Sequence, residues 1–389
     1  MQPPLTSSAA KSEPQSGWVY YHWFVLAVIF AITALRWLQG IDPDLWWHIR
    51  AGNWMIDHRQ LLQVDLFSST RYGEAWQHPD WLAQILIATV YRLGEMKGVF
   101  LFFAAIYTAG VALLMRASKT HRAVTLGVAL LAVLASEIAA AAKPAMFSYL
   151  FVILFLITLE QGAHRTQRIV LPLLTLLWTN LHGGFTLGFA LLGLYGLFPL
   201  LARGVQAVLR RKSDPVLAPE MRQHLVQFAI LLGLCLGAAL INPYGADNLI
   251  YLARSTSVQT GAMNALIVEW LPPDFGAANG QILLGVIAAV LVLFGLAPRR
   301  HLLGYLISAL FLGLTLMHVR MVLFWGPVVQ FFLGQVLWTG KPETLQEKRW
   351  IKAAMLGAAA AAVVLPAALV LTGEAIQASV KAQYPAAAA

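Results

Sequence analysis

The 389-residue chain has little charge and almost no cysteine. Asp, Glu, Lys and Arg make up only 12% of its residues, about half the share in soluble domains, whereas 59% are hydrophobic. Its single cysteine, Cys235, lies in an apolar run, so an intrachain disulfide is excluded. The alternating short segments of a membrane β-barrel are also missing. These absences predict an all-α, polytopic membrane protein.

Several motifs of soluble chemistry are absent too. The chain has no Walker motif, no dinucleotide-binding glycine fingerprint, no G-x-S-x-G elbow and no H-E-x-x-H sequence. The spacings of its histidines and acids fit no metal motif, so neither a metal site nor a cofactor is predicted. A divalent cation bound by Asp42 or Asp44 stays open. The net charge of +9 is scattered among short loops, which indicates membrane orientation and not a nucleic-acid partner.

Apolar runs of membrane-spanning length divide the chain. We expect a transmembrane domain over 18–371, preceded by a disordered cytoplasmic segment at 1–17 and followed by a short tail at 372–389. About eleven spans are predicted: 18–39, 98–115, 123–142, 145–160, 168–180, 183–202, 224–241, 280–297, 301–317, 321–339 and 350–371.

Basic residues predict the orientation of these spans. Clusters at 116–122, 164–168, 203–222, 299–300 and 341–349 are typical of cytoplasmic loops. The spans between them pair up if 79–96 does not cross but lies in the interface as a helix. The loops 40–97 and 242–279 then face the periplasm or exterior, together with most of the unusual polar residues. We therefore expect a multi-pass membrane protein with a site on its outer face.

Asp42-Pro43-Asp44 directly follows the first apolar run. Proline prevents the helix from simply continuing. Ionisable groups at this depth are costly and are often functional, so either acid is a candidate general base. The alternative is a solvated pair at a helix end.

Trp46, Trp47 and His48 continue this segment. Indole rings favour the headgroup zone, so they are either interfacial anchors or a stacking platform for a sugar ring or an isoprenoid chain. His48 and the two tryptophans are therefore candidate substrate-binding residues.

Two cations lie next to apolar spans on the expected outer face. Lys143 precedes Pro144, and its ammonium either binds a phosphate or snorkels at a helix end. Arg320 follows His318, and a guanidinium fork suits a phosphodiester. Its alternative is a charge that sets topology. His182 precedes Gly183-Gly184, which either allows close backbone approach to a ligand or makes a tight turn.

Two outer loops supply further candidates. Asn242-Pro243-Tyr244-Gly245 is a turn by its chemistry, and Tyr244 could face headgroups. Glu269 lies in the long segment 242–279 and is the second carboxylate candidate, with a structural role equally open.

The same segments resemble a set of bacterial multi-pass proteins with an Asp-x-Trp-Trp-His-Leu-x-x-Gly-x-Trp signature. Residues 42–54 and His78-Pro79-Asp80-Trp81-Leu82-Ala83-Gln84 carry the first two matches. Leu181-His182-Gly183-Gly184-Phe185, Asn242-Pro243-Tyr244-Gly245 and Glu269-Trp270 match in order. Those proteins are similar to the GT-C superfamily of membrane glycosyltransferases.

The resemblance implies a protein of a bacterial inner membrane, with interfacial helices in the first outward loop and an Asp there as base. It implies a polyprenyl-phosphate sugar as donor, with a glycan, lipid or protein as acceptor. Asp44 or Asp42 would be the base, and Lys143 or Arg320 would hold the phosphate. A non-enzymatic transporter or assembly partner that binds lipid-linked glycans is the alternative.

Overall fold

The computed structural model describes residues 16–39, 42–210, 219–250 and 267–337. The predicted span 350–371, the tail 372–389 and nearly all of the predicted N-terminal segment lie outside these ranges. Parts of the two outward loops, 40–41 and 251–266, lie outside them as well.

The described residues form helices joined by turns, with only an isolated bridge between Val64 and Ala75 and no strand. The helices are α1 (Ser16–Gln39), α2 (Asp44–His58), α3 (Trp81–Ala117), α4 (Arg122–Ser136), α5 (Ala145–Gln161), α6 (His164–Leu181), η1 (Gly183–Phe185), α7 (Thr186–Arg210), α8 (Pro219–Ala239), η3 (Val268–Trp270), α10 (Ala278–Leu296), α11 (Leu302–Met317), η4 (Val319–Met321) and α12 (Val322–Val336).

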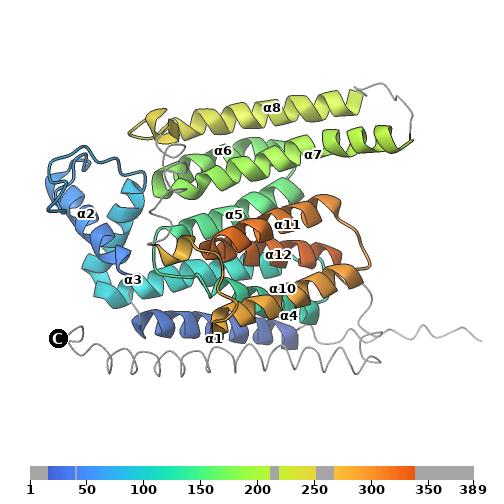
Figure 1. Ribbon diagram of the computed structural model, residues 1–389, viewed down its shortest axis with the longest axis horizontal. Helices are drawn as coiled ribbons and strands as arrows, with labels where there is room; N and C mark the ends of the chain where they lie inside the picture. The colour runs from blue at the N-terminus through green and yellow to red at the C-terminus, as the bar shows by residue number, and fades with distance from the viewer. Residues whose placement is uncertain (1–15, 40–41, 211–218, 251–266, 338–389) are drawn as a thin grey trace, which may run out of the picture.

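The long helices lie side by side along the long axis of the molecule, and α2 with the loop after it caps one end (Figure 1). We call this the α2 end. Of the described helices, five are long and apolar enough to cross a membrane: Trp81–Ala117, Gly183–Val205, Pro219–Ala239, Ala278–Leu296 and Val319–Val336. The all-helical, membrane-type architecture is therefore as predicted, whereas eleven crossings remain a prediction.

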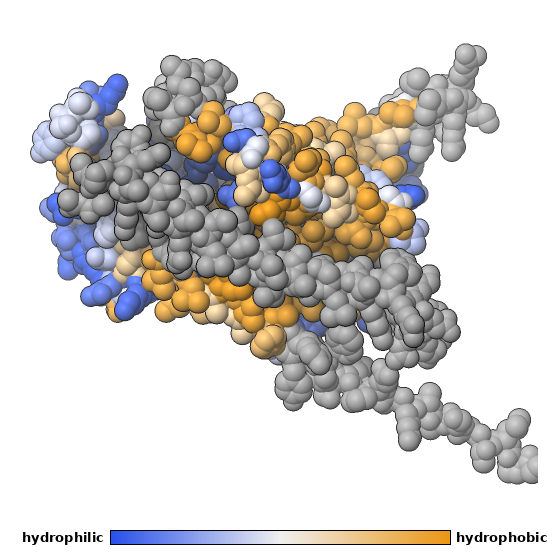
Figure 2. Space-filling model, turned by 60° about the horizontal axis from the view of Figure 1, so that its bottom comes forward, coloured by the Kyte–Doolittle hydropathy of each residue, from blue (hydrophilic) through white to orange (hydrophobic). Residues whose placement is uncertain are grey.

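The hydropathy of the surface follows this arrangement. Where Figure 2 is coloured, apolar residues make up most of the surface between the ends of the molecule, and hydrophilic residues gather at the α2 end. Helix α12 lies within the bundle, with all of its residues buried. It packs against α4 and α11, so residues just before its first turn are held by the core.

The expected interfacial helix is continuous with the next span but bends sharply. Within α3, Gly94 and Glu95 leave helical geometry, and Glu95 has a φ of 52°. This kink falls close to the predicted boundary between 96 and 98. It separates a segment that packs on α2 from the long apolar helix that follows.

One predicted span is shorter than expected. Helix α4 ends at Ser136, whereas the sequence suggested helix to residue 142. The last turn of α1 explains the difference, because Arg36 and Trp37 donate hydrogen bonds to the carbonyl oxygen of Ala140. Arg36 also pairs with Glu137 through its side chain and its carbonyl. These bonds hold 137–144 as a turn.

Candidate functional site

The charged residues of three distant segments meet at one point of the α2 end. The Lys143 ammonium lies 2.5 Å from a Glu269 carboxylate oxygen and 3.1 Å from one of Asp42. Burial disfavours the charge on Lys143, but Glu269 and Asp42 outweigh it and raise the pKa of this lysine. The three predicted residues therefore form one ionised cluster.

Asp44 begins α2 beside this cluster. Pro43 occupies the cap position, and the Asp44 amide donates to the Asp42 carboxylate over 3.0 Å. Asp44 makes no ion pair among the described residues, and it is exposed. Partial desolvation and the negative charge of Asp42 raise its pKa, while Lys143 opposes the shift. Asp42 is thus paired with a cation that it shares with Glu269, whereas the carboxylate of Asp44 stays available to accept a proton.

Close packing of α2 on α3 holds His48 inside. A Cβ at Gly52 would lie 2.0 Å from the carbonyl oxygen of Gln84, so only glycine allows this approach. His48 lies one turn before Gly52 and is 4% exposed. Burial, followed by the nearby His182, Lys143 and His78, lowers its pKa to about 3. His48 is therefore a neutral imidazole close to the ionised cluster.

Aromatic rings flank this histidine. The ring centroids of Trp47 and His48 are 3.8 Å apart, those of Trp76 and His78 3.9 Å, and those of the two tryptophans 5.5 Å. Trp46 is different, because its side chain is 51% exposed. The structure therefore brings Trp47 to the site and turns Trp46 outward, as an interfacial anchor would be.

Arg320 lies at the start of α12 and faces the segment that carries Glu269. Its guanidinium carbon is 5.2 Å from the ring centroid of Trp270. His318 Nδ1 donates to the Trp270 carbonyl oxygen over 2.6 Å, and the Val319 amide donates to the carbonyl of Leu271 over 2.8 Å. These contacts dock 269–271 on the turn before α12. No carboxylate of the described residues pairs with Arg320, so its donors remain available to an anion.

His182 follows α6 and faces the two cations. Burial, and then the positive charges of Arg320 and Lys143, lower its pKa to about 3. Its Nδ1 lies 2.6 Å from Ser148 Oγ and 3.1 Å from the Gly184 amide nitrogen. His182 is therefore uncharged at neutral pH, and its ring is held through Nδ1.

Tyr244 belongs to a neighbouring network. Its hydroxyl accepts a hydrogen bond from the His78 amide over 3.1 Å. The indole of Trp81 donates to Asn180 over 2.9 Å, and the Asn180 amide donates to the carbonyl of Ile241 over 3.0 Å. Tyr244 thus connects the segment 242–245 to the residues just before α3. None of these hydrogen bonds involves the ionised cluster.

An apolar groove of about 420 Å³ lies along this network. It is lined by Trp81, Leu82, Leu176, Leu177, Asn180, Ile241, Asn242 and Pro243. Asn180, one of its lining residues, precedes His182 by two residues, so the groove lies close to the end of α6. Its lining suits a hydrocarbon chain more than a polar ligand.

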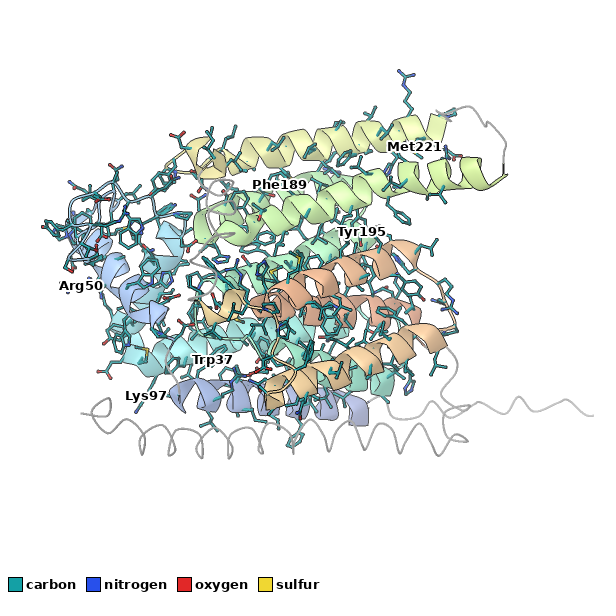
Figure 3. All side chains as sticks on the ribbon, in the orientation of Figure 1. Trp37, Arg50, Lys97, Phe189, Tyr195 and Met221 are labelled. Carbon is teal, nitrogen blue, oxygen red and sulfur yellow. The ribbon has the colours of Figure 1, made fainter. Side chains whose placement is uncertain are left out.

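The structure also contains functional candidates that we did not predict. Arg36 and Glu137 make a largely buried ion pair, and Thr33 donates to the same carboxylate over 2.8 Å. Figure 3 places Trp37, the neighbour of Arg36, toward the α2 end of α1. Both charges are isolated within apolar runs, and that isolation is the signal that could have identified them. The pair holds the turn that carries Lys143.

A metal centre gains no support from the described residues. Among them, no group of three or more His, Cys, Asp or Glu side chains is arranged to hold a metal ion. The comparisons with known proteins give no assignment either, since no family model, curated protein or solved structure matches the chain.

Asp80, at the edge of the site, should make the stability of the folded protein depend on pH. It accepts a hydrogen bond from the Gly183 amide over 3.2 Å, and burial raises its pKa from 3.8 to about 7. The folded chain therefore binds a proton that the unfolded chain has lost, so stability falls as the pH rises from about 4 to about 7. We expect Asp80→Asn to raise the thermal unfolding midpoint at pH 8 and to change it little at pH 4.

Differential scanning fluorimetry in detergent at both pH values measures this effect. Asp57→Asn serves as the control, because Asp57 is exposed and pairs with Arg92 at the surface. An equal effect of Asp80→Asn at pH 4 and pH 8 would contradict the account.

Proposed function

We propose that the chain is a membrane glycosyltransferase of the GT-C type, which moves a sugar from a polyprenyl-phosphate donor to an acceptor on the periplasmic side. The acceptor is a glycan, a lipid or a protein. The observation that carries the proposal is that Asp44, Lys143 and Arg320 lie near one another at one end of an apolar bundle, since Lys143 affects the pKa of Asp44 and both cations affect that of His182. A base beside phosphate-binding cations is the arrangement that this reaction needs.

The chemistry follows from the position of each group. Asp44 takes the proton of the acceptor hydroxyl as its oxygen attacks the anomeric carbon. The bond from that carbon to the phosphate oxygen breaks, and the electron pair leaves with the polyprenyl phosphate. Direct displacement inverts the anomeric centre. Lys143 and Arg320 stabilise the negative charge of the departing phosphate.

The ion pairs of Lys143 fit this role. In the unliganded chain its charge is balanced by Asp42 and Glu269, so the ammonium is not left unpaired at the membrane edge. A phosphate that binds beside Arg320 would exchange with one of these carboxylates. Glu269 is more easily displaced than Asp42, because its side chain is 38% exposed and that of Asp42 is 18% exposed.

The groove beside His182 supports a lipid-borne substrate. Hydrocarbon lies in apolar surroundings while a charged head stays at the membrane edge. The groove along Trp81 and Asn180 and the cations beyond His182 provide these two environments next to each other.

The test is to incubate the purified protein with a radiolabelled polyprenyl-phosphate hexose and a membrane extract as acceptor source. We expect release of free polyprenyl phosphate and transfer of the label, both lost in Arg320→Ala. Arg300→Ala is the control, since Arg300 is exposed and donates to the Phe294 carbonyl near the opposite end of α10. Binding without release in the wild type would favour a transporter or an assembly partner. No binding would contradict the proposal.

A further inference from the structure

A chain of hydrogen bonds reaches from the core of the bundle to His182. The indole nitrogen of Trp178, a fully buried residue of α6, lies 2.6 Å from Ser148 Oγ on α5. Ser148 Oγ lies 2.6 Å from His182 Nδ1. An indole N–H can only donate, so the serine oxygen accepts from Trp178, and its bond to the histidine can run in either direction.

The backbone of Gly184 fixes the direction of the last bond. Its N–H points at His182 Nδ1 over 3.1 Å, and a backbone amide can only donate. Nδ1 must therefore carry a lone pair and no proton. The neutral ring then has its single proton on Nε2, which has no hydrogen-bond partner among the described residues.

Sterics protect the same arrangement. A Cβ at Gly184 would lie 2.3 Å from Ser148 Oγ and 2.9 Å from His182 Nδ1. Any side chain at this position would collide with the hydrogen bond itself. The sequence suggested that Gly183-Gly184 allows close backbone approach to a ligand. At Gly184 the close approach is instead to the side chains of Ser148 and His182.

We infer that Trp178 and Ser148 are positioning residues that lock His182 as the Nε2–H tautomer, so that it offers one neutral N–H to the anion bound by Lys143 and Arg320. This inference deepens the proposed function, because it assigns the third donor of the phosphate site. A neutral donor adds a hydrogen bond to a phosphodiester without adding charge, and it excludes His182 as an acid or base in the reaction.

The lock is tested first without substrate, on protein labelled with ¹⁵N at its histidines and held in nanodiscs. Nitrogen-15 NMR distinguishes the two tautomers, and the spectrum of His182→Gln identifies the signals of His182. We expect a protonated Nε2 and a bare Nδ1 that do not titrate between pH 5 and pH 8. In Ser148→Ala we expect the Nδ1 signal to shift. Ser308→Ala is the matched control, because Ser308 is a buried serine of α11 whose hydroxyl has no hydrogen-bond partner in the part of the chain that the structure describes.

The second readout is the affinity for farnesyl phosphate. Hydrogen bonds to charged groups contribute enough that His182→Leu should weaken binding by roughly tenfold or more. His182→Gln, whose amide supplies an N–H near the position of Nε2, should restore much of it. A proton on Nδ1, or titration of His182 near pH 6.5, would overturn the inference.

The two proposals fail separately. The predicted tautomer in a protein that never releases polyprenyl phosphate would leave the inference standing and refute the glycosyltransferase. Sugar transfer by a protein whose His182 is protonated at Nδ1 would support the glycosyltransferase and refute the inference.

Discussion

Asp44→Asn should lower the turnover of sugar transfer by roughly 10²–10⁴-fold while the protein folds and inserts normally, because general-base assistance has this magnitude. The substitution keeps the size of the side chain and the start of α2, since the helix is held by Pro43 and the packing of Gly52 on α3. The KM for the donor should change little. Initial rates of label transfer measure both quantities.

Two comparisons make this result specific to Asp44. Asp57→Asn alters the same helix at a side chain 59% exposed and paired with Arg92, so it should leave the rate unchanged. Asp42→Asn removes a partner of Lys143 and should act mainly on KM. Because the pKa of Asp44 is raised, activity should fall on the acid side at a higher pH than an ordinary aspartate would give. Full activity of Asp44→Asn would refute the assignment of the base.

Glu137→Ala should lower the free energy of unfolding. Leaving a buried charge without its partner usually costs about 3–5 kcal/mol, and we expect a loss near the lower end of that range. The lower end applies because the Arg36 side chain keeps 36% exposure. The turn 137–144 should loosen as well, so donor binding through Lys143 should weaken. Unfolding in mixed micelles, followed by tryptophan fluorescence, gives the first effect, and the KM for the donor gives the second.

A matched pair and a double variant separate charge from packing. Glu74→Ala breaks the exposed ion pair with Arg71, which should contribute at most about 1 kcal/mol. Arg36→Met with Glu137→Met should recover most of the lost stability, because apolar residues often replace a buried ion pair without loss. The donor KM should stay high in that double variant, since the hydrogen bonds of Arg36 to the turn are gone. A double variant as unstable as Glu137→Ala would contradict this account.

Much of the fold was readable from the sequence, because apolar length and basic loops are both consequences of a lipid environment. The segments around α5, α10 and α11 were predicted to within a few residues. Helix α4 was predicted too long, since hydropathy alone cannot show that Arg36 and Trp37 take the carbonyl of Ala140. Helix α6 begins earlier than predicted, at His164, because its first turn is polar and lies before the apolar run from which the span was predicted.

The site was predictable by residue type but not by contact. Carboxylates and cations beside apolar spans identified Asp42, Lys143 and Glu269, yet nothing in the sequence shows that one lysine bridges both acids. Nor does it distinguish Trp46 from Trp47, because adjacent residues of a helix point in different directions and only packing on α3 decides which is buried. Ser148 went unnoticed, since a lone serine in an apolar helix is unremarkable until its partner is known.

The most direct test of the shared site is the sidedness of Asp44 and Arg320. Asp44→Cys and Arg320→Cys would each be introduced into a Cys235→Ala chain, which removes the single native cysteine. Both should react with a membrane-impermeant maleimide in spheroplasts, where only the outer face is accessible, and neither in sealed inverted vesicles. Labelling of the two positions from opposite sides would mean that they cannot bind one substrate.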